Sequence, residues 1–265
     1  MKIYISADME GVTGASHWDE VNKEKEVYQK LVEQMTSEVK AVCDGANNAG
    51  ALEVWVKDAH DTGRNIDVSK LPRNVKYSRV FSGHPFLMMQ DLDSSFDAIA
   101  MIGYHSFAGS NGSPLAHTLD TTVNYIIIND QYASEFLVNA YTASLVNVPV
   151  ILVSGDEQLC NHVLEFNNQI KTIAVNKGIG KSTISIHPAL AVDVIKEGIE
   201  SALKNDLSKY HIELPDYFVV EISFFHPYMA YKASFYPGAE QISPNSILFK
   251  SENYFDVLRM FSFVI

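Results

Sequence analysis

Strand-like and helix-like segments alternate along the first two thirds of this chain, and this alternation constrains the fold more than any other feature. Short apolar segments rich in β-branched residues predict strands at Lys2–Ala7, Leu52–Val56 and Ala98–Ile102. Apolar residues recur at steps of three and four over residues 27–49, which predicts a helix, and Gly50 follows where a helix C-cap is expected. The pattern predicts an α/β fold, with a three-layer αβα arrangement around a mostly parallel sheet.

The segments after residue 120 first continue the alternation of strands and helices and then lose it. Further strands are predicted at Val123–Ile128, Val148–Ser154, Thr172–Val175, Phe218–Phe224 and Ile247–Lys250, and further helices at Ser134–Val146, Glu157–Phe166, Ala189–Leu203 and Tyr254–Phe263. The alternation changes in character after about residue 177. We therefore expect an α/β domain over residues 1–180 that carries the catalytic site, and a smaller α+β domain over residues 181–265.

Composition and charge narrow the class of protein. The 265 residues include 20 Lys+Arg against 32 Asp+Glu, a net charge of −12, which argues against nucleic acid or an anionic membrane surface as partner. The longest apolar runs, such as Val148–Val153, are too short to span a bilayer, and the segment Met1–Asp8 is unlike a signal peptide. Cys43 and Cys160 form neither a disulfide framework nor a thiolate zinc site. We expect a cytoplasmic protein.

Carboxylates and imidazoles follow the predicted strands at the point where each strand ends. Asp8 and Glu10 follow the first strand. His60 follows the second strand, and His105 follows the strand that begins at Ala98. Open α/β sheets place their functional sites at the carboxyl ends of their strands, so these side chains are expected to converge.

The spacing and type of these residues predict a metal site. Asp8 and Glu10 are two residues apart, which at a strand end places both carboxylates on one side of the backbone. Two such carboxylates repel each other unless a proton or cation lies between them. With His60 and His105 they offer oxygen and nitrogen ligands without thiolate, which suits Zn²⁺ or Mn²⁺, and Glu135 brings enough ligands for two ions. Singly, each residue also fits a cap or loop position, so the prediction depends on their convergence.

His117 is a candidate for the chemical step. It follows the segment Ala108–Ser113, which contains two Gly and two Ser and is expected to be mobile and able to lie over a cleft. His117 could be a metal ligand, a general acid or base beside the metal, or a structural histidine.

Several other signals favour structural roles. Gly178–Ser182 resembles the end of a phosphate-binding loop but lacks the required spacing. Gly155–Glu157 is typical of a helix cap and first turn, and Cys160 of a small core residue. The aromatic residues between Phe224 and Tyr236 are expected in the core or at a subunit interface.

The segment Ser6–Gly11 resembles the Ser-x-Asp-x-Glu-Gly signature of the DppA-type D-aminopeptidases, peptidase family M55. Four further segments resemble this family in the same order, namely Lys57–His60, Gly103–His105, Ala116–Thr118 and Ile128–Ala140. The resemblance covers most of the chain and is weakest in the C-terminal part.

The resemblance implies a di-zinc hydrolase that removes D-amino acids from the N-termini of short peptides. It implies that Asp8 bridges the two ions. Glu10 and His105 would complete the ligands of one ion, and His60 and Glu135 those of the other.

The resemblance also implies that His117 is the catalytic residue and that the protein forms a ring-like homo-oligomer, decameric in the best-known case. Ser134 stands where the family usually has glycine, and Asn176 and Lys181 stand near positions that carry other residues, so substrate contacts there would differ. Asp58 is a weak candidate for contact with the substrate's amino group.

Two other functions stay open at this point. The same ligands could serve a metal-dependent hydrolase of another small amide or ester, or the chain could be a binding module without activity. Substrate length, side-chain preference and D-selectivity are not encoded in any of these motifs.

Overall fold

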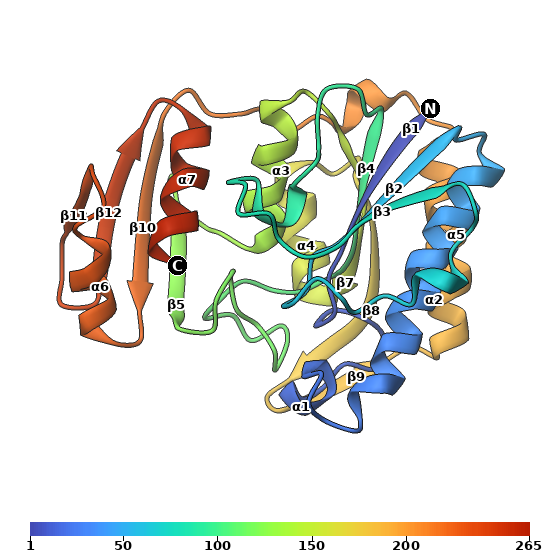
Figure 1. Cartoon of the computed structure of the whole chain (residues 1–265), viewed down its shortest axis with the longest axis horizontal. Coiled ribbons are helices and arrows are strands. Elements are labelled where there is room, and N and C mark those ends of the chain that lie inside the picture. Colours follow the sequence, from blue (N-terminus) through green and yellow to red (C-terminus); the bar gives the residue numbers. More distant parts are fainter.

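The computed structural model describes residues 1–265 and contains two β-sheets that lie side by side (Figure 1). The first sheet consists of β1 (Lys2–Ala7), β2 (Glu53–Asp58), β3 (Val75–Ser78), β4 (Ala98–Tyr104), β7 (Val150–Asp156), β8 (Lys171–Ile179) and β9 (Ser182–Ser185). Its strand order is β3-β2-β1-β4-β7-β8-β9. All neighbours in it are parallel except β8 and β9.

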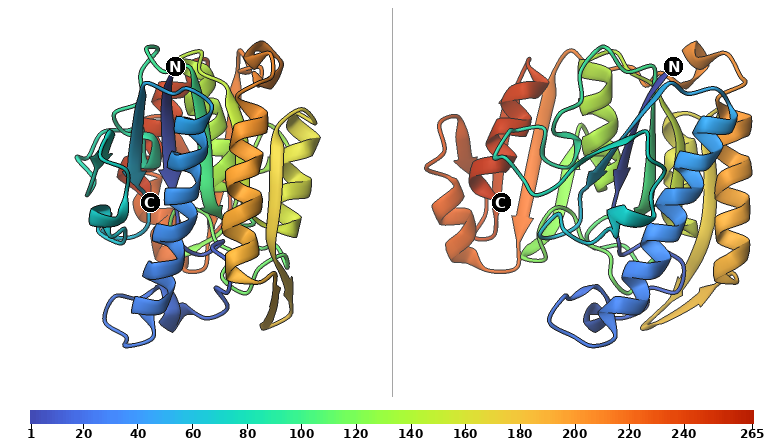
Figure 2. Two further views of the ribbon diagram at one scale, coloured as in Figure 1. Left: turned by 90° about the vertical axis from the view of Figure 1, so that its right-hand side faces the viewer. Right: turned by 45° about the vertical axis from the view of Figure 1, so that its right-hand side comes forward.

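Helices cover both faces of this sheet. The long helices α2 (Tyr28–Asn48) and α5 (Pro188–Ala202) pack together on one face, and α3 (Glu135–Leu145) and α4 (Glu157–Phe166) lie on the other (Figures 1 and 2). The short helix α1 (Trp18–Val21) follows β1. The expected three-layer αβα architecture with a mostly parallel sheet is confirmed.

The second sheet is antiparallel throughout. It consists of β5 (Val123–Ile128), β6 (Gln131–Tyr132), β10 (Phe218–Phe224), β11 (Ala239–Gln241) and β12 (Ser246–Ser251), in the order β11-β12-β10-β5-β6. Helix α6 (Pro227–Ala233) packs on it, and α7 (Tyr254–Val264) lies between this sheet and α3 (Figure 1). The hydroxyl of Tyr254 donates a hydrogen bond of 2.8 Å to the carbonyl of Val138, so α7 is joined directly to α3.

Sheet membership does not follow the boundary that the sequence suggested near residue 180. Strand β9 and helix α5 come after that position yet belong with the first sheet, whereas β5 and β6 come before it and belong to the second. The reason is that β5 pairs with β10, for example Ile126 with Ile222, and such a distant pairing has no local signal. One continuous cluster of 73 buried apolar residues includes residues of both sheets, so the two parts form one packed body.

Three connecting features complete the fold. Short 3₁₀ helices occur at Val68–Lys70, Leu87–Met89 and Leu207–Tyr210. The segment Gly178–Ser182 is the β8–β9 hairpin, with Gly180 at φ +60°, which explains its glycines without a bound phosphate. None of the helices combines the length and the apolar character that crossing a membrane requires.

Candidate active site

The carboxylates and imidazoles expected to converge do so at the carboxyl ends of β2, β1 and β4. These three strands are neighbours in the sheet, so Asp8, His60 and His105 emerge side by side. Glu10 lies just beyond Asp8, and Glu135 is the first residue of α3. All five side chains are buried. The positive end of the α3 dipole favours the charge of Glu135.

Asp8 directs one carboxylate oxygen toward each of two imidazoles. His60 Nδ1 lies 3.4 Å from Asp8 Oδ1 and 3.0 Å from Glu10 Oε2. His105 Nε2 lies 3.3 Å from both Asp8 Oδ2 and Glu135 Oε2. His60 therefore contacts Glu10 and His105 contacts Glu135, while Asp8, Glu10 and His105 also offer atoms within 4.8 Å of one another, the set that the resemblance implied for one ion.

Backbone carbonyls orient both imidazoles. His60 Nε2 lies 3.0 Å from the carbonyl of Val21, and His105 Nδ1 lies 3.0 Å from the carbonyl of Ser106. A carbonyl only accepts hydrogen bonds, so these nitrogens carry the ring protons. The other nitrogen of each ring faces carboxylates and needs a second proton or a cation, which is the arrangement of metal-ligating histidines.

The charges of the site act on one another strongly. Burial alone would lower the pKa of His60 and of His105, but the neighbouring carboxylates outweigh it and hold both pKa values well above the usual range. Burial would likewise raise the pKa of Asp8, but the close contacts with His105 and His60 hold it well below its usual value. The site therefore attracts positive charge, as protons or as metal ions.

The donor atoms fit a metal centre. Asp8 Oδ2, Glu10 Oε2 and His105 Nε2 are buried and make no hydrogen bond. Buried polar atoms without partners are costly, and an ion bound among them would satisfy all three. Asp8, Glu10 and His105 each offer an atom within 4.8 Å of the others, as do His105, His117 and Glu135. Oxygen and nitrogen donors without sulfur suit Zn²⁺ and related ions.

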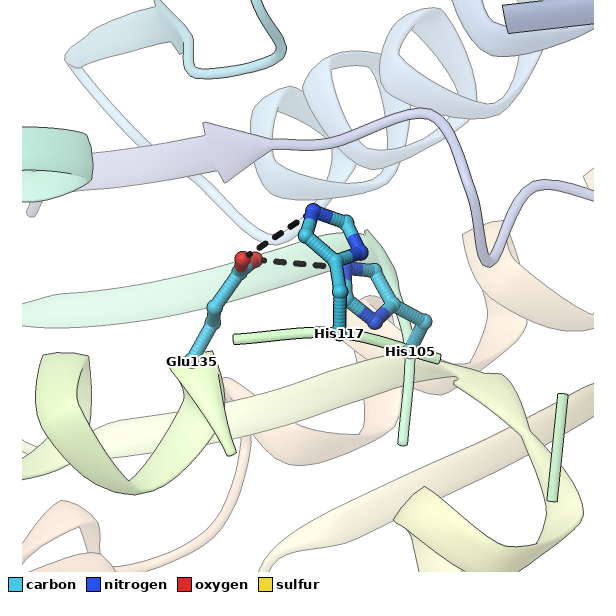
Figure 3. Close-up of side chains that lie close together, drawn as sticks. All are labelled: His105, His117 and Glu135. Atoms are coloured by element: carbon cyan, nitrogen blue, oxygen red, sulfur yellow. Dashed lines mark ion pairs between the residues drawn. The ribbon is translucent and has the colours of Figure 1, made fainter. Parts of the chain in front are cut away.

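His117 stacks on His105 at the open side of the cluster. The ring centroids are 4.2 Å apart and the planes 10° from parallel. His117 Nδ1 lies 3.0 Å from the carbonyl of Leu115, and Nε2 points toward Glu135 Oε1 at 3.6 Å (Figure 3). The side chain of His117 is 14% exposed and that of Glu135 is 4% exposed. A substrate in the cavity can therefore reach His117 more easily than Glu135.

A cavity of about 840 Å³ opens over these residues. Asp61 and Asp120 add acidic groups to its lining, and Lys23 is its one lysine or arginine. Its apolar lining residues include Phe81, Leu87 and Trp18. The cavity is large enough for a small ligand such as a short peptide.

The segment Ala108–Ser113 does not cover this cavity, contrary to expectation. It lines a smaller neighbouring cavity and is attached at both ends. The amide of Gly178 donates to the carbonyl of Gly112 at 2.9 Å, and the amide of Ala108 donates to Thr118 Oγ1 at 3.0 Å.

Two residues considered for substrate contact have structural roles instead. Asp58 is buried and accepts hydrogen bonds from Asn65, whose side chain donates to the carbonyl of His60 at 2.6 Å. Asn176 donates to the carbonyl of Val12 at 2.8 Å and so holds the loop that follows Glu10. Both therefore position metal-site loops.

The structure gives roles to two residues, Asp156 and Ser134, that the sequence did not reveal. Asp156 caps α4, as expected, but it also accepts from the amide of Ser106 at 2.7 Å and so supports the carbonyl that orients His105. Ser134 caps α3 by accepting from the amide of Leu137 at 3.3 Å, which gives the serine a role at that position.

The fold and the site together define an α/β protein with a buried carboxylate–histidine cluster suited to a metal ion. A model of peptidase family M55, D-aminopeptidase, matches residues 1–263, and the chain belongs to this family. It is a metallo-aminopeptidase. A D-aminopeptidase of Bacillus subtilis (strain 168) is 32% identical over 243 residues, which cover 91% of this chain and 87% of that protein. The solved structure of the Zn-dependent D-aminopeptidase DppA from Bacillus subtilis, described as a self-compartmentalizing protease, has a TM-score of 0.92 and 28% identity, covering 100% of this chain and 96% of that one.

Proposed function

We propose that this protein uses two zinc ions to remove an N-terminal D-amino acid from short peptides. The observation that carries the proposal is the buried carboxylate of Asp8, which directs one oxygen toward each of two metal-competent imidazoles. The similarity to a zinc-dependent D-aminopeptidase supports zinc as the metal and D-residues as the substrate class.

The ligands divide into two sets that share Asp8. The group of Asp8, Glu10 and His105 fits one ion, which leaves His60 and Glu135 with Asp8 for the other, while the contacts of His60 with Glu10 and of His105 with Glu135 support the reverse pairing; Asp8 is shared in both. Metal ions in such a site supply positive charge that lowers the pKa of water and polarises a carbonyl group.

His117 transfers the proton that the leaving group requires. Its Nε2 faces the cavity while Nδ1 is held by the carbonyl of Leu115, so the ring has one free nitrogen in a fixed orientation. With Nδ1–H donating to that carbonyl, Nε2 first accepts the proton released by the attacking water and then delivers it to the leaving peptide nitrogen, which otherwise departs poorly. The acidic lining, including Asp61 and Asp120, favours the ammonium group of a peptide N-terminus.

Metal analysis paired with hydrolysis assays tests this function. We expect two zinc ions per chain and cleavage of D-alanyl peptides in preference to L-alanyl peptides. Cleavage of other small amides or esters with no cleavage of peptides would favour the alternative hydrolase. Purified protein that binds no transition metal would contradict both.

Metal binding is expected to release protons. The raised pKa values keep His60 and His105 protonated at neutral pH in the metal-free protein, and these protons must leave before the nitrogens can bind an ion. We expect release of up to about two protons per chain at pH 7 and weaker zinc binding as the pH falls. Calorimetric titration with zinc in two buffers of different ionisation enthalpy measures the release. Equal heats in both buffers would contradict it.

We propose in addition that the chain forms a ring-like homo-oligomer, as large as a decamer. Exposed aromatic side chains gather on α6 and its flanks, namely Phe225, Tyr228, Tyr231 and Phe235. Such a surface is typical of an interface between subunits, and the similar DppA is described as self-compartmentalizing.

Light scattering is expected to show a species several times the mass of the monomer. Replacing both Tyr231 and Phe235 with aspartate should shift it toward smaller species, because charges would be buried in the interface. Tyr77→Asp, at an exposed aromatic residue on β3, is the control and should leave the assembly intact. A wild-type protein of monomer mass at micromolar concentration would refute the proposal.

A further inference from the structure

Phe81 and His117 both line the cavity, and the strand order indicates how they are placed. The strand order β3-β2-β1-β4 places the segment after β3, which contains Phe81, next to the end of β2, which carries His60. Asp8 and then His105 follow along the same edge, and His117 stacks on His105. The cavity therefore has a Phe81 end and a His117 end, with the metal site between them.

The backbone next to Phe81 is held in an unusual conformation. Val80 has φ +66°, a left-handed value that a β-branched residue rarely adopts. Its amide donates to the carbonyl of Gly63 at 3.0 Å, and its carbonyl accepts from Lys57 Nζ at 2.6 Å. A side chain at position 63 would lie 2.6 Å from the Val80 nitrogen, so the close approach requires glycine. Strain of this kind persists only where surrounding contacts impose it.

Lys57 also fixes the ring of Phe81. The lysine is fully buried on β2, and its Nζ lies 4.1 Å from the centroid of the Phe81 ring. Its ammonium group donates to a backbone carbonyl rather than to a carboxylate, and burial lowers its pKa to about 8. The Val80 carbonyl and the Phe81 ring thus take the place of a counter-ion. Phe81 itself is 37% exposed and lines the cavity, so one face of this fixed ring is open to a ligand.

We propose that Phe81 determines specificity by packing against the side chain of the substrate's N-terminal residue, and that Lys57 is a positioning residue for it. The inference rests on the proposed aminopeptidase function. Because His117 delivers its proton to the leaving nitrogen, the leaving part of the peptide lies at the His117 end. The N-terminal residue then extends toward Phe81, where Leu87 also lines the wall. An alanine methyl group is too short to cover much of the ring, whereas a leucine side chain can.

Binding of amino-acid hydroxamates to the zinc-loaded protein tests this without requiring turnover. The probes are the alanine and leucine hydroxamates, each as both enantiomers, titrated by calorimetry. Phe81→Ala is expected to weaken binding of the leucine probe about 10-fold or more while changing that of the alanine probe much less, since a lost apolar contact of this size is worth roughly 10- to 200-fold. Phe81→Leu should retain most of the preference. Tyr77→Ala, at an exposed aromatic residue on β3 outside the cavity, is the control.

The role of Lys57 is tested by the same leucine-to-alanine ratio. Lys57→Met removes the ammonium group and should reduce the ratio, whereas Lys57→Gln keeps a donor for the Val80 carbonyl and should reduce it less. An unchanged ratio in Phe81→Ala, or equal loss for both probes, would overturn the proposal. If the leucine-to-alanine ratio responds to Phe81 but the protein binds the L-hydroxamates better, the specificity role of Phe81 stands and the proposed D-selectivity is wrong. Failure of this inference and failure of the proposed function therefore give different results.

Discussion

Replacing Asp8 with alanine is expected to empty both metal positions and reduce peptidase activity to background. The two oxygens of Asp8 face different imidazoles, at 3.4 Å from His60 and 3.3 Å from His105, so a single substitution removes a ligand from each ion. His60→Ala and His105→Ala should each lose about one ion per chain, because each imidazole faces mainly one set of ligands. Elemental analysis of the purified variants measures these losses.

Asp97→Asn is the control for Asp8→Ala. Asp97 is an exposed carboxylate just before β4, at the opposite end of that strand from His105, and it accepts from the amide of Lys2. The variant should therefore keep both metals. Circular dichroism separates metal loss from unfolding. Two ions and normal activity in Asp8→Ala would show that Asp8 does not bridge.

Replacing His117 with alanine is expected to slow catalysis by roughly 10²- to 10⁴-fold, the usual contribution of a positioned general acid or base. KM should change much less than kcat, and metal content and thermal stability should stay near wild type, since the ring is stacked at the open side of the cluster. His117→Gln keeps a hydrogen-bond donor but exchanges no proton near neutral pH, so it should also be poorly active.

The control for His117 is His84→Gln. His84 lines the same cavity but makes no contact with a carboxylate, so its replacement should leave kcat within a few-fold. Loss of one metal from His117→Ala, in step with activity, would make His117 a ligand in the group it forms with His105 and Glu135. Near-normal activity would make it structural.

The part of the site that lies on the parallel sheet could be predicted from the sequence. Asp8, His60 and His105 each follow a segment with a clear strand pattern, and parallel strands bring their carboxyl ends to one edge. Predicting where these strands end was therefore nearly enough to predict which side chains meet. The helices could also be predicted, because apolar periodicity and caps such as Asp156 are local signals.

The features that could not be predicted depend on contacts between distant parts of the chain. The pairing of β5 with β10 joins residues such as Ile126 and Ile222, and nothing near either strand identifies its partner. The same applies to Asn176, which reaches a loop more than 160 residues away in the chain to bond with Val12. The segment Ala108–Ser113 is fixed by β8, although its composition is typical of a mobile loop.

The position of Glu135 on α3 gives the metal centre a mechanical role. Asp8 and His105 belong to the parallel sheet, whereas Glu135 begins the helix that α7 joins to the antiparallel sheet through Tyr254. An ion held by all three would join the edge of the parallel sheet to the first turn of a helix that covers it, and so would close a loop of more than a hundred residues, as a disulfide does. Because Tyr254 of α7 bonds to α3, a displacement of α7 would reach Glu135 through that helix.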